Sequence, residues 1–230
     1  MAVLRVASVA KLLSLMNIQH DNIMLSYNKA LEGKVIPDLE IELKQYLENI
    51  RSILDYTAHD IEHHYLLGRD IVHFPIVGKS SDLKSFEGAV GRNLPSLKEK
   101  SAILYKYLES IQPYHDNYRW LGDLSDVTNI KKHTNLIPQK RMEDSFVTVS
   151  SGNGSVSWGS GVTFGSGVSI MGVPIDPYTQ MPVHNNSINV KKEIWVDFVF
   201  EGSEISILGL LRSTKERIPI IVKDIYNHMQ

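Results

Sequence analysis

The sequence contains no cysteine among its 230 residues. Disulfide bonds, zinc ribbons and thiol nucleophiles are therefore excluded, because each of them requires cysteine sulfur. No apolar run approaches the roughly 20 residues that a membrane-spanning helix needs. At the N-terminus, Lys11 interrupts a mildly apolar stretch whose helical spacing continues past it, which predicts a first helix and not a secretion signal. These absences predict a cytoplasmic protein without disulfides and without a membrane anchor.

The chain also lacks a basic excess, since 24 Lys and Arg residues stand against 26 Asp and Glu residues. Proteins dedicated to nucleic acids usually carry such an excess. One local basic tract, KKHTNLIPQKR at 131–141, predicts a solvated loop or, as the alternative, a basic patch. The chain has no Walker A motif, no G-x-G-x-x-G after a strand and no G-x-S-x-G. Nucleotide-binding and hydrolase classes that depend on these motifs are therefore not supported.

Helical periodicity dominates the first half of the chain. Between residues 38 and 67, apolar residues recur at steps of three and four, which predicts one long helix with a single buried stripe. The predicted stripe consists of Leu39, Leu43, Leu47, Ile50, Leu54, Ala58, Ile61 and Tyr65. Weaker patterns predict further helices over 7–31, 81–91, 96–111 and 117–133.

Near residue 145 the composition changes to one that favours strands and turns. The segment VSWGSGVTFGSGVSIMGV at 156–173 predicts short strands joined by glycine turns, because three six-residue units are too few for a hexapeptide β-helix. The alternation of Ile194, Val196, Phe198 and Phe200 predicts a strand with one buried face, a pattern that ends near residue 200.

A last helix is predicted over 205–228, with a kink or a break at Pro219. The order of these elements predicts an α+β fold. It consists of an N-terminal antiparallel helical bundle (1–144), a small antiparallel β-rich region (145–204) and a C-terminal helix (205–230) that can pack on the bundle. A bundle that exposes its apolar stripe would also favour a homodimer.

Polar residues crowd into 50–65, on the predicted long helix. Because successive helical residues turn by about 100°, one strip beside the buried stripe contains Arg51, Asp55, His59 and either Glu62 or His63. Three interpretations follow. His59 and His63 have the i, i+4 spacing of a metal-binding pair. The strip could instead supply acid/base or phosphate-handling groups, or form a structural network in which Asp55 pairs with Arg51 and His59.

A second polar strip lies on the predicted helix over 117–133. Asp126, Asn129 and His133 share one face at i, i+3 and i+7, with Lys132 adjacent. If this helix packs antiparallel to the long helix, Asn129 and His133 can meet Asp55 and His59 in one cleft. The alternative for His133 is a histidine at a helix C-terminus that interacts with the last carbonyls.

Four stretches resemble a group of uncharacterised bacterial proteins. IRSILDYTAHDI at 50–61, FPI at 74–76, IQPY at 111–114 and LSDVTNIKKHTNL at 124–136 are similar in order and spacing to that group's LRSALDH, FPI, QPY and NIDKHR motifs. The similarity extends over about 45–137. The matching polar positions are Arg51, Asp55, Asn129, Lys132 and His133.

The Arg-x4-His spacing in that group's first motif is similar to the spacing in HEPN helical domains, many of which act on RNA. The resemblance therefore implies a HEPN-like helical domain that contacts RNA or a partner protein through Arg51, Lys132 and His133. However, Tyr56 stands where the group has His, which removes the general acid/base of a HEPN-type nuclease. Lys131 and Thr134 also depart from the pattern, standing where the group has Asp and Arg.

The sequence thus predicts a binding protein without catalysis or a cofactor, with RNA or a protein as its partner. Its candidate binding residues are Arg51, Asp55, His59, Asn129, Lys132 and His133. The alternative is a metal-dependent hydrolase that holds Zn, Fe or Mn. Its candidate ligands are His59, His63, His133 and Asp55.

Overall fold

The chain forms two compact units in the computed structural model, which describes residues 5–31, 39–66, 71–130, 139–152, 154–159, 161–200 and 203–229. Unit 1 comprises residues 1–139 and 199–230, and unit 2 comprises residues 140–198. The N-terminal bundle and the C-terminal helix therefore belong to one unit. In the described residues, no helix is long and apolar enough to cross a membrane.

The described residues form seven α-helices, one 3-10 turn and six strands, which confirms the predicted α+β class with its N-terminal helical bundle, small β region and C-terminal helix. The helices are α1 (Val6–Leu31), α2 (Leu39–Tyr65), α3 (Leu83–Asn93), α4 (Leu97–Lys100), α5 (Ala102–Ser110), α6 (Arg119–Ile130) and α7 (Ile207–His228), with the 3-10 turn η1 at Asp116–Tyr118. The strands are β1 (Gln139–Ser151), β2 (Gly154–Gly159), β3 (Ser169–Ile170), β4 (Val173–Asp176), β5 (Met181–Pro182) and β6 (Asn189–Phe200).

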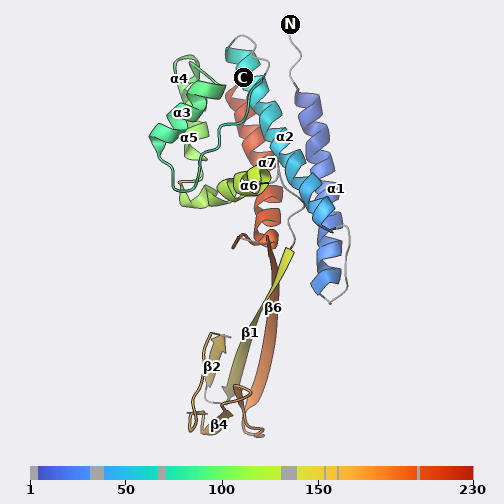
Figure 1. Ribbon diagram of the computed structural model, residues 1–230, viewed down its shortest axis with the longest axis vertical. Helices are drawn as coiled ribbons and strands as arrows, with labels where there is room; N and C mark the ends of the chain where they lie inside the picture. Colours follow the sequence, from blue (N-terminus) through green and yellow to red (C-terminus); the bar gives the residue numbers. More distant parts are fainter. Residues whose placement is uncertain are drawn as a thin grey trace. The chain divides into compact units, whose positions relative to one another are not determined.

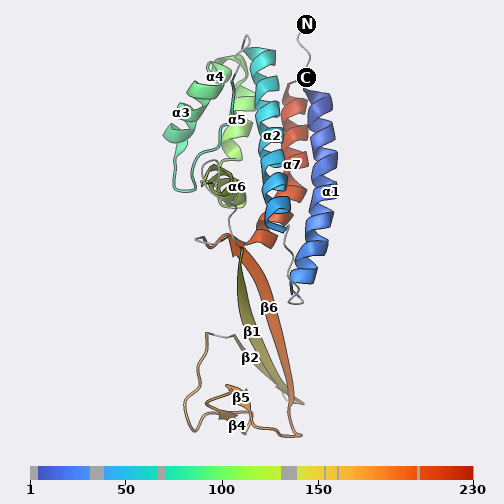
Figure 2. The ribbon, with the colours of Figure 1, turned by 45° about the vertical axis from the view of Figure 1, so that its right-hand side comes forward.

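Helix α2 is the centre of unit 1, where it contacts α1, α6 and α7 (Figures 1 and 2). Its predicted stripe is buried from Leu39 to Ile61, and Tyr65 is half-buried. The buried arc is wider than the stripe, because it also includes Tyr46, Ile53, Thr57 and Asp60. A helix covered by neighbours on several sides buries more than one face.

Hydrogen bonds fix the direction of the helices around α2. Arg5 N donates to Asp60 Oδ1 over 2.8 Å, and Asn49 Nδ2 donates to Gln19 Oε1 over 2.9 Å, so α1 and α2 run antiparallel. Helix α7 runs parallel to α2 and antiparallel to α1 (Figure 1). It is continuous through Pro219, so the proline does not break the helix.

Two predicted helices differ from the structure at their ends. The pattern over 96–111 forms two helices, α4 and α5, because Ser101 ends the first and caps the second by accepting from Leu104 N over 3.4 Å. The pattern over 117–133 begins with η1 and continues as α6, whose described part ends at Ile130. Helix α6 also lies across α2 in both views of the ribbon, so the antiparallel packing on which the hypothesis of a shared cleft depended is not found (Figures 1 and 2).

Unit 2 has its own hydrophobic core. Its first sheet has the order β2-β1-β6 and its second the order β3-β4-β5. Strand β1 pairs antiparallel with β2, which places Val147 opposite Trp158. These two residues form the core together with Val149 and Ile175. The segment at 156–173 is therefore strands and turns, as predicted, whereas the side chains of Ile194, Val196, Phe198 and Phe200 lie outside the described residues.

The contact between α2 and α7 includes a buried polar pair, Tyr46 and Thr214. The two hydroxyl oxygens lie 2.9 Å apart, and both side chains are fully buried. Thr214 Oγ1 donates to the carbonyl of Leu210 over 2.8 Å or to that of Leu211 over 2.9 Å, so the Tyr46 hydroxyl donates to Thr214. Burial raises the pKa of Tyr46 to about 12.

We expect Thr214→Val to lower the free energy of unfolding by about 1–3 kcal/mol, because it keeps the side-chain shape but leaves the Tyr46 hydroxyl buried without an acceptor. Urea denaturation measures this change. The double variant Tyr46→Phe with Thr214→Val should recover most of the loss, since both polar partners are then absent. A double variant as unstable as Thr214→Val would show that the cost does not come from the unpaired hydroxyl.

Candidate functional site

Arg51 and Asp55, the first two predicted site residues, bind the backbone of the extended segment 71–78. Asp55 Oδ1 accepts from Phe74 N over 2.8 Å, and Arg51 Nη2 donates to Phe74 O over 3.4 Å. Arg51 Nε lies 3.5 Å from Asp55 Oδ1, so the two side chains also pair with each other. Phe74 is 1% exposed. The pair therefore supplies a hydrogen-bond donor and an acceptor to a buried peptide that has no strand or helix partner.

Other side chains complete the support of segment 71–78. Gln112 Oε1 accepts from Val77 N over 3.2 Å, and Gln112 Nε2 donates to Pro75 O over 3.0 Å. Asn93 Oδ1 accepts from His73 N over 3.1 Å. Three of the four stretches that carry the family resemblance, at 50–61, 74–76 and 111–114, thus meet at this segment. The side chains of Arg51, Asp55 and Gln112 form hydrogen bonds with the main chain of the segment.

His59 and His63 do not join this network. His59 is half-buried, and its pKa is lowered, first by burial and then by the positive charge of Arg5. His63 is exposed. The imidazole that lies beside Asp55 belongs instead to His73, whose Nδ1 is 3.3 Å from Asp55 Oδ2. Asp55 thus forms its predicted pair with Arg51. Toward His59 it has a charge effect, which raises the pKa of His59 against the effect of burial.

The second predicted strip is described only in part. Asn129 is exposed and donates to Ser125 Oγ over 3.0 Å, one turn back on α6. Lys132, His133 and the basic tract at 131–138 lie outside the described residues. Within the described ranges, no group of three or more His, Asp or Glu side chains could hold a metal ion.

A polar cluster that the sequence did not predict lies between the end of segment 71–82 and α6. Lys79 Nζ is 2.5 Å from Asp123 Oδ1 and 3.3 Å from Asp126 Oδ2, and these carboxylates raise the pKa of Lys79. The lysine side chain crosses Gly122, where an added Cβ would lie 2.6 Å from Lys79 Cγ. Gly122 therefore permits the close approach. The cluster lines a cavity of about 450 Å³ with Ser203, Glu204, Ile205 and Ser206.

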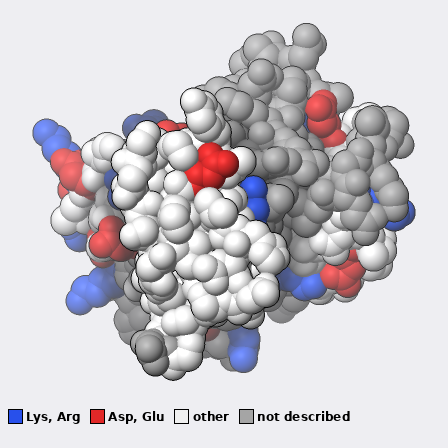
Figure 3. Space-filling model, turned by 90° about the horizontal axis from the view of Figure 1, so that it is seen from below, with Lys and Arg blue, Asp and Glu red and all other residues white. Residues whose placement is uncertain are grey.

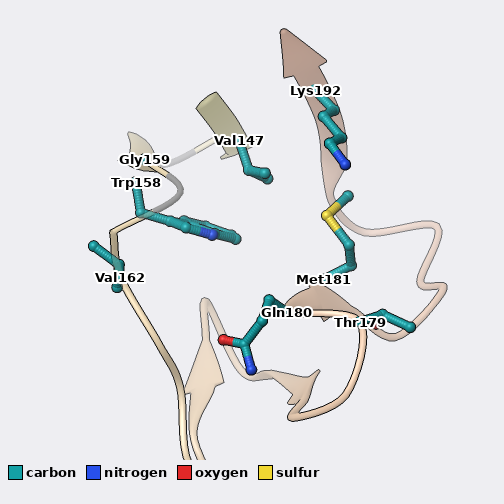
Figure 4. A pocket seen from close by; sticks show the side chains of 8 residues that line it. All are labelled: Val147, Trp158, Gly159, Val162, Thr179, Gln180, Met181 and Lys192. Carbon is teal, nitrogen blue, oxygen red and sulfur yellow. The ribbon is translucent and has the colours of Figure 1, made fainter. Parts of the chain in front are cut away.

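Unit 2 contains a smaller hollow, of about 190 Å³, beside Trp158. Figure 4 shows Trp158 and Val147 on one side of it, Met181 and Lys192 on the other, and Gln180 below. Trp158 and Val147 come from paired positions of β1 and β2, Met181 from β5 and Lys192 from β6. The hollow therefore depends on strands that are distant in sequence.

Gln180 lines the lower side of this hollow. Gln180 has a left-handed backbone with φ of 59°, which is uncommon for a residue other than glycine. Its side chain accepts from Phe164 N over 2.7 Å and donates to Phe164 O over 3.3 Å. Phe164 in turn meets the Trp158 ring edge to face, with centroids 5.1 Å apart. These contacts fix the hollow in shape before any ligand binds.

The surface of unit 2 carries few charges among its described side chains. The charged ones are Asp176, Lys191 and Lys192. Figure 3 shows a broad area of uncharged side chains, interrupted by isolated acidic and basic ones. Several large apolar side chains of the unit are exposed, and Tyr178 is exposed to 96%. One of them, Val162, lines the hollow.

Comparisons of the chain with models of protein families, with curated proteins and with solved structures find no match. The function must therefore be argued from the geometry of the two units.

The role of Asp55 predicts a stability effect. Asp55→Ala should lower the free energy of unfolding by about 1–3 kcal/mol, because it leaves the buried Phe74 N–H without an acceptor. Asp55→Asn should cost less, since the amide oxygen can still accept. Thermal or urea unfolding measures both, with His63→Ala as the control at an exposed position, expected within about 0.5 kcal/mol of the parent. Equal stabilities of Asp55→Ala and His63→Ala would contradict this role.

Proposed function

We propose that the protein is a non-catalytic binding protein and that the hollow beside Trp158 is its ligand site. The observation that carries this proposal is a preformed, mainly apolar hollow that contains one cation, Lys192, with no hydrogen bond or ion pair to any residue that the structure describes. Ligand sites are typically concave and apolar, with a few polar groups that fix the orientation of the ligand.

The chemistry of the hollow supports binding over catalysis. Its described lining residues include no carboxylate, imidazole or thiol, so they offer no pair of groups for general acid/base chemistry. Gln180 uses both of its amide atoms to hold Phe164, which leaves it no role toward a substrate. The hollow therefore offers a ligand apolar side chains and one ammonium group, that of Lys192.

The two predictions from the helical unit have weaker support. Arg51 is already paired with Asp55 and with the Phe74 carbonyl, so its guanidinium is less available to RNA than the sequence implies. In a metal-dependent hydrolase, Asp55 would have to bind the metal while it also accepts from Phe74 N. RNA contact through Lys132 and His133, a HEPN-like relationship, a homodimer and a cytoplasmic location stay predictions of the sequence.

Small neutral aromatic probes test the proposed site in the full chain. Indole and 4-methylphenol should shift the NMR signals of the Trp158 indole and the Met181 methyl group in a saturable manner. Val162→Phe should weaken binding by about tenfold or more, because Val162 lines the hollow and a phenyl ring would fill it. Val183→Phe is the matched control, since Val183 is also exposed in unit 2 but does not line the hollow.

Two results would contradict the proposed site. One is the absence of saturable shifts at Trp158 and Met181 for both probes. The other is equal weakening by Val162→Phe and Val183→Phe. A single-stranded RNA that bound the protein and left both signals unchanged would favour the RNA hypothesis in place of this site.

A further inference from the structure

The positive charge of Lys192 favours anionic ligands in the hollow. Lys192 is exposed on β6, and its ammonium points toward the Met181 side of the hollow (Figure 4). The other charged side chains described in unit 2 do not neutralise it. Asp176 Oδ1 accepts from Tyr178 N over 2.8 Å and from Thr179 N over 3.4 Å, within its own turn. Lys191 has the same sign of charge as Lys192.

The rest of the hollow has little to offer a polar ligand. Trp158 and Val147 are 6% and 4% exposed, and they present ring and methyl surface. Met181 adds a thioether, which packs well against aromatic rings. In Figure 4 the Thr179 side chain points away from the hollow. The ligand therefore needs an apolar group for the walls and, at one end, an anionic group for Lys192.

Size limits the apolar group. An empty cavity of about 150 Å³ with apolar walls accommodates one benzene ring. The hollow beside Trp158 measures about 190 Å³. One aromatic ring with a short link to the anion therefore fits.

We infer that the hollow binds an organic carboxylate with a single aromatic ring, the ring between Trp158 and Met181 and the carboxylate on Lys192. This inference rests on the proposed ligand site. Two sources share the chemistry: a free arylalkanoic acid, and the C-terminal residue of a peptide that ends in Phe or Tyr.

The pair that Lys192 makes is exposed, so its contribution is modest and sensitive to salt. We expect 3-phenylpropionate to bind about threefold to fivefold more tightly than 3-phenylpropionamide at low ionic strength, in line with exposed ion pairs. Concentrated salt should reduce this ratio toward one. Because the two probes differ only in the anionic group, their ratio isolates the role of charge.

The test measures both dissociation constants by NMR titration of the full chain and of two variants. Lys192→Gln should bring the ratio to about one, because it removes the ammonium group that pairs with the carboxylate. Lys191→Gln is the matched control and should keep the parent ratio, because adjacent residues of a strand point to opposite faces. Two further probes, pentapeptides ending in Phe with a free or an amidated C-terminus, identify the source. Tighter binding of the free-terminus peptide than of 3-phenylpropionate assigns a peptide, and the reverse order assigns a small acid.

The possible outcomes distinguish a failure of the carboxylate inference from a failure of the proposed ligand site. A parent ratio near one, with amide and neutral probes still bound at Trp158, overturns the carboxylate inference and leaves the ligand site intact. A ratio that Lys191→Gln lowers as much as Lys192→Gln also overturns it. If no probe shifts the Trp158 signal, the proposed site fails together with the inference.

Discussion

The helical unit depends on how the backbone of segment 71–78 is satisfied. This segment lies against the core with Val72 and Phe74 almost fully buried, whereas Ile71, His73 and Gly78 are exposed, and it belongs to no helix or strand. A buried peptide group without a partner costs free energy comparable to a lost hydrogen bond. Asp55 and Arg51 meet this cost at Phe74, and Gln112 meets it at Pro75 and Val77. The segment thereby joins α2 to the end of α5.

The need to satisfy this backbone gives Arg51 and Asp55, on the polar strip of α2, a structural role. Arg51 and Asp55 have residue types that suit catalysis or RNA contact, but their nearest partners are main-chain atoms of a buried loop. The same holds for Gln112, which is fully buried and also donates to Leu108 O over 2.8 Å. A ligand site is therefore expected where a charged side chain does not bind the protein's own main chain. Lys192, exposed on β6 of unit 2, is such a group among the described residues.

Much of the fold was accessible from the sequence, because helical periodicity records burial directly. The stripe from Leu39 to Ile61 predicted α2 to within a few residues. The break at Ser101 was missed because a capping hydroxyl interrupts a helix without disturbing the apolar pattern around it. Pro219 was expected to kink or break α7, and it does not break the helix, because the surrounding apolar face continues and packing holds it.

The candidate sites were less accessible, for a physical reason. Asp55 accepts a hydrogen bond from Phe74 N, which lies 19 residues further along the chain in a segment without helical or strand periodicity. Lys79 packs across Gly122, which lies 43 residues further along the chain. The hollow of unit 2 combines β1, β2, β5 and β6, so it exists only once strand register is set. Sequence spacing indicates which residues share a face of one element. It does not indicate which irregular backbone will cross that face.

Amide hydrogen exchange of segment 71–78 tests the central claim most directly. The account predicts that the Phe74 and Val77 amides exchange slowly, as core helix amides do, although neither lies in a helix or a strand. In Asp55→Ala, protection should fall at Phe74 and persist at Val77, which Gln112 holds independently. Exchange at Phe74 as fast as at the exposed Gly78 in the parent protein would contradict the account, because the segment would then be a loop and not a buried support.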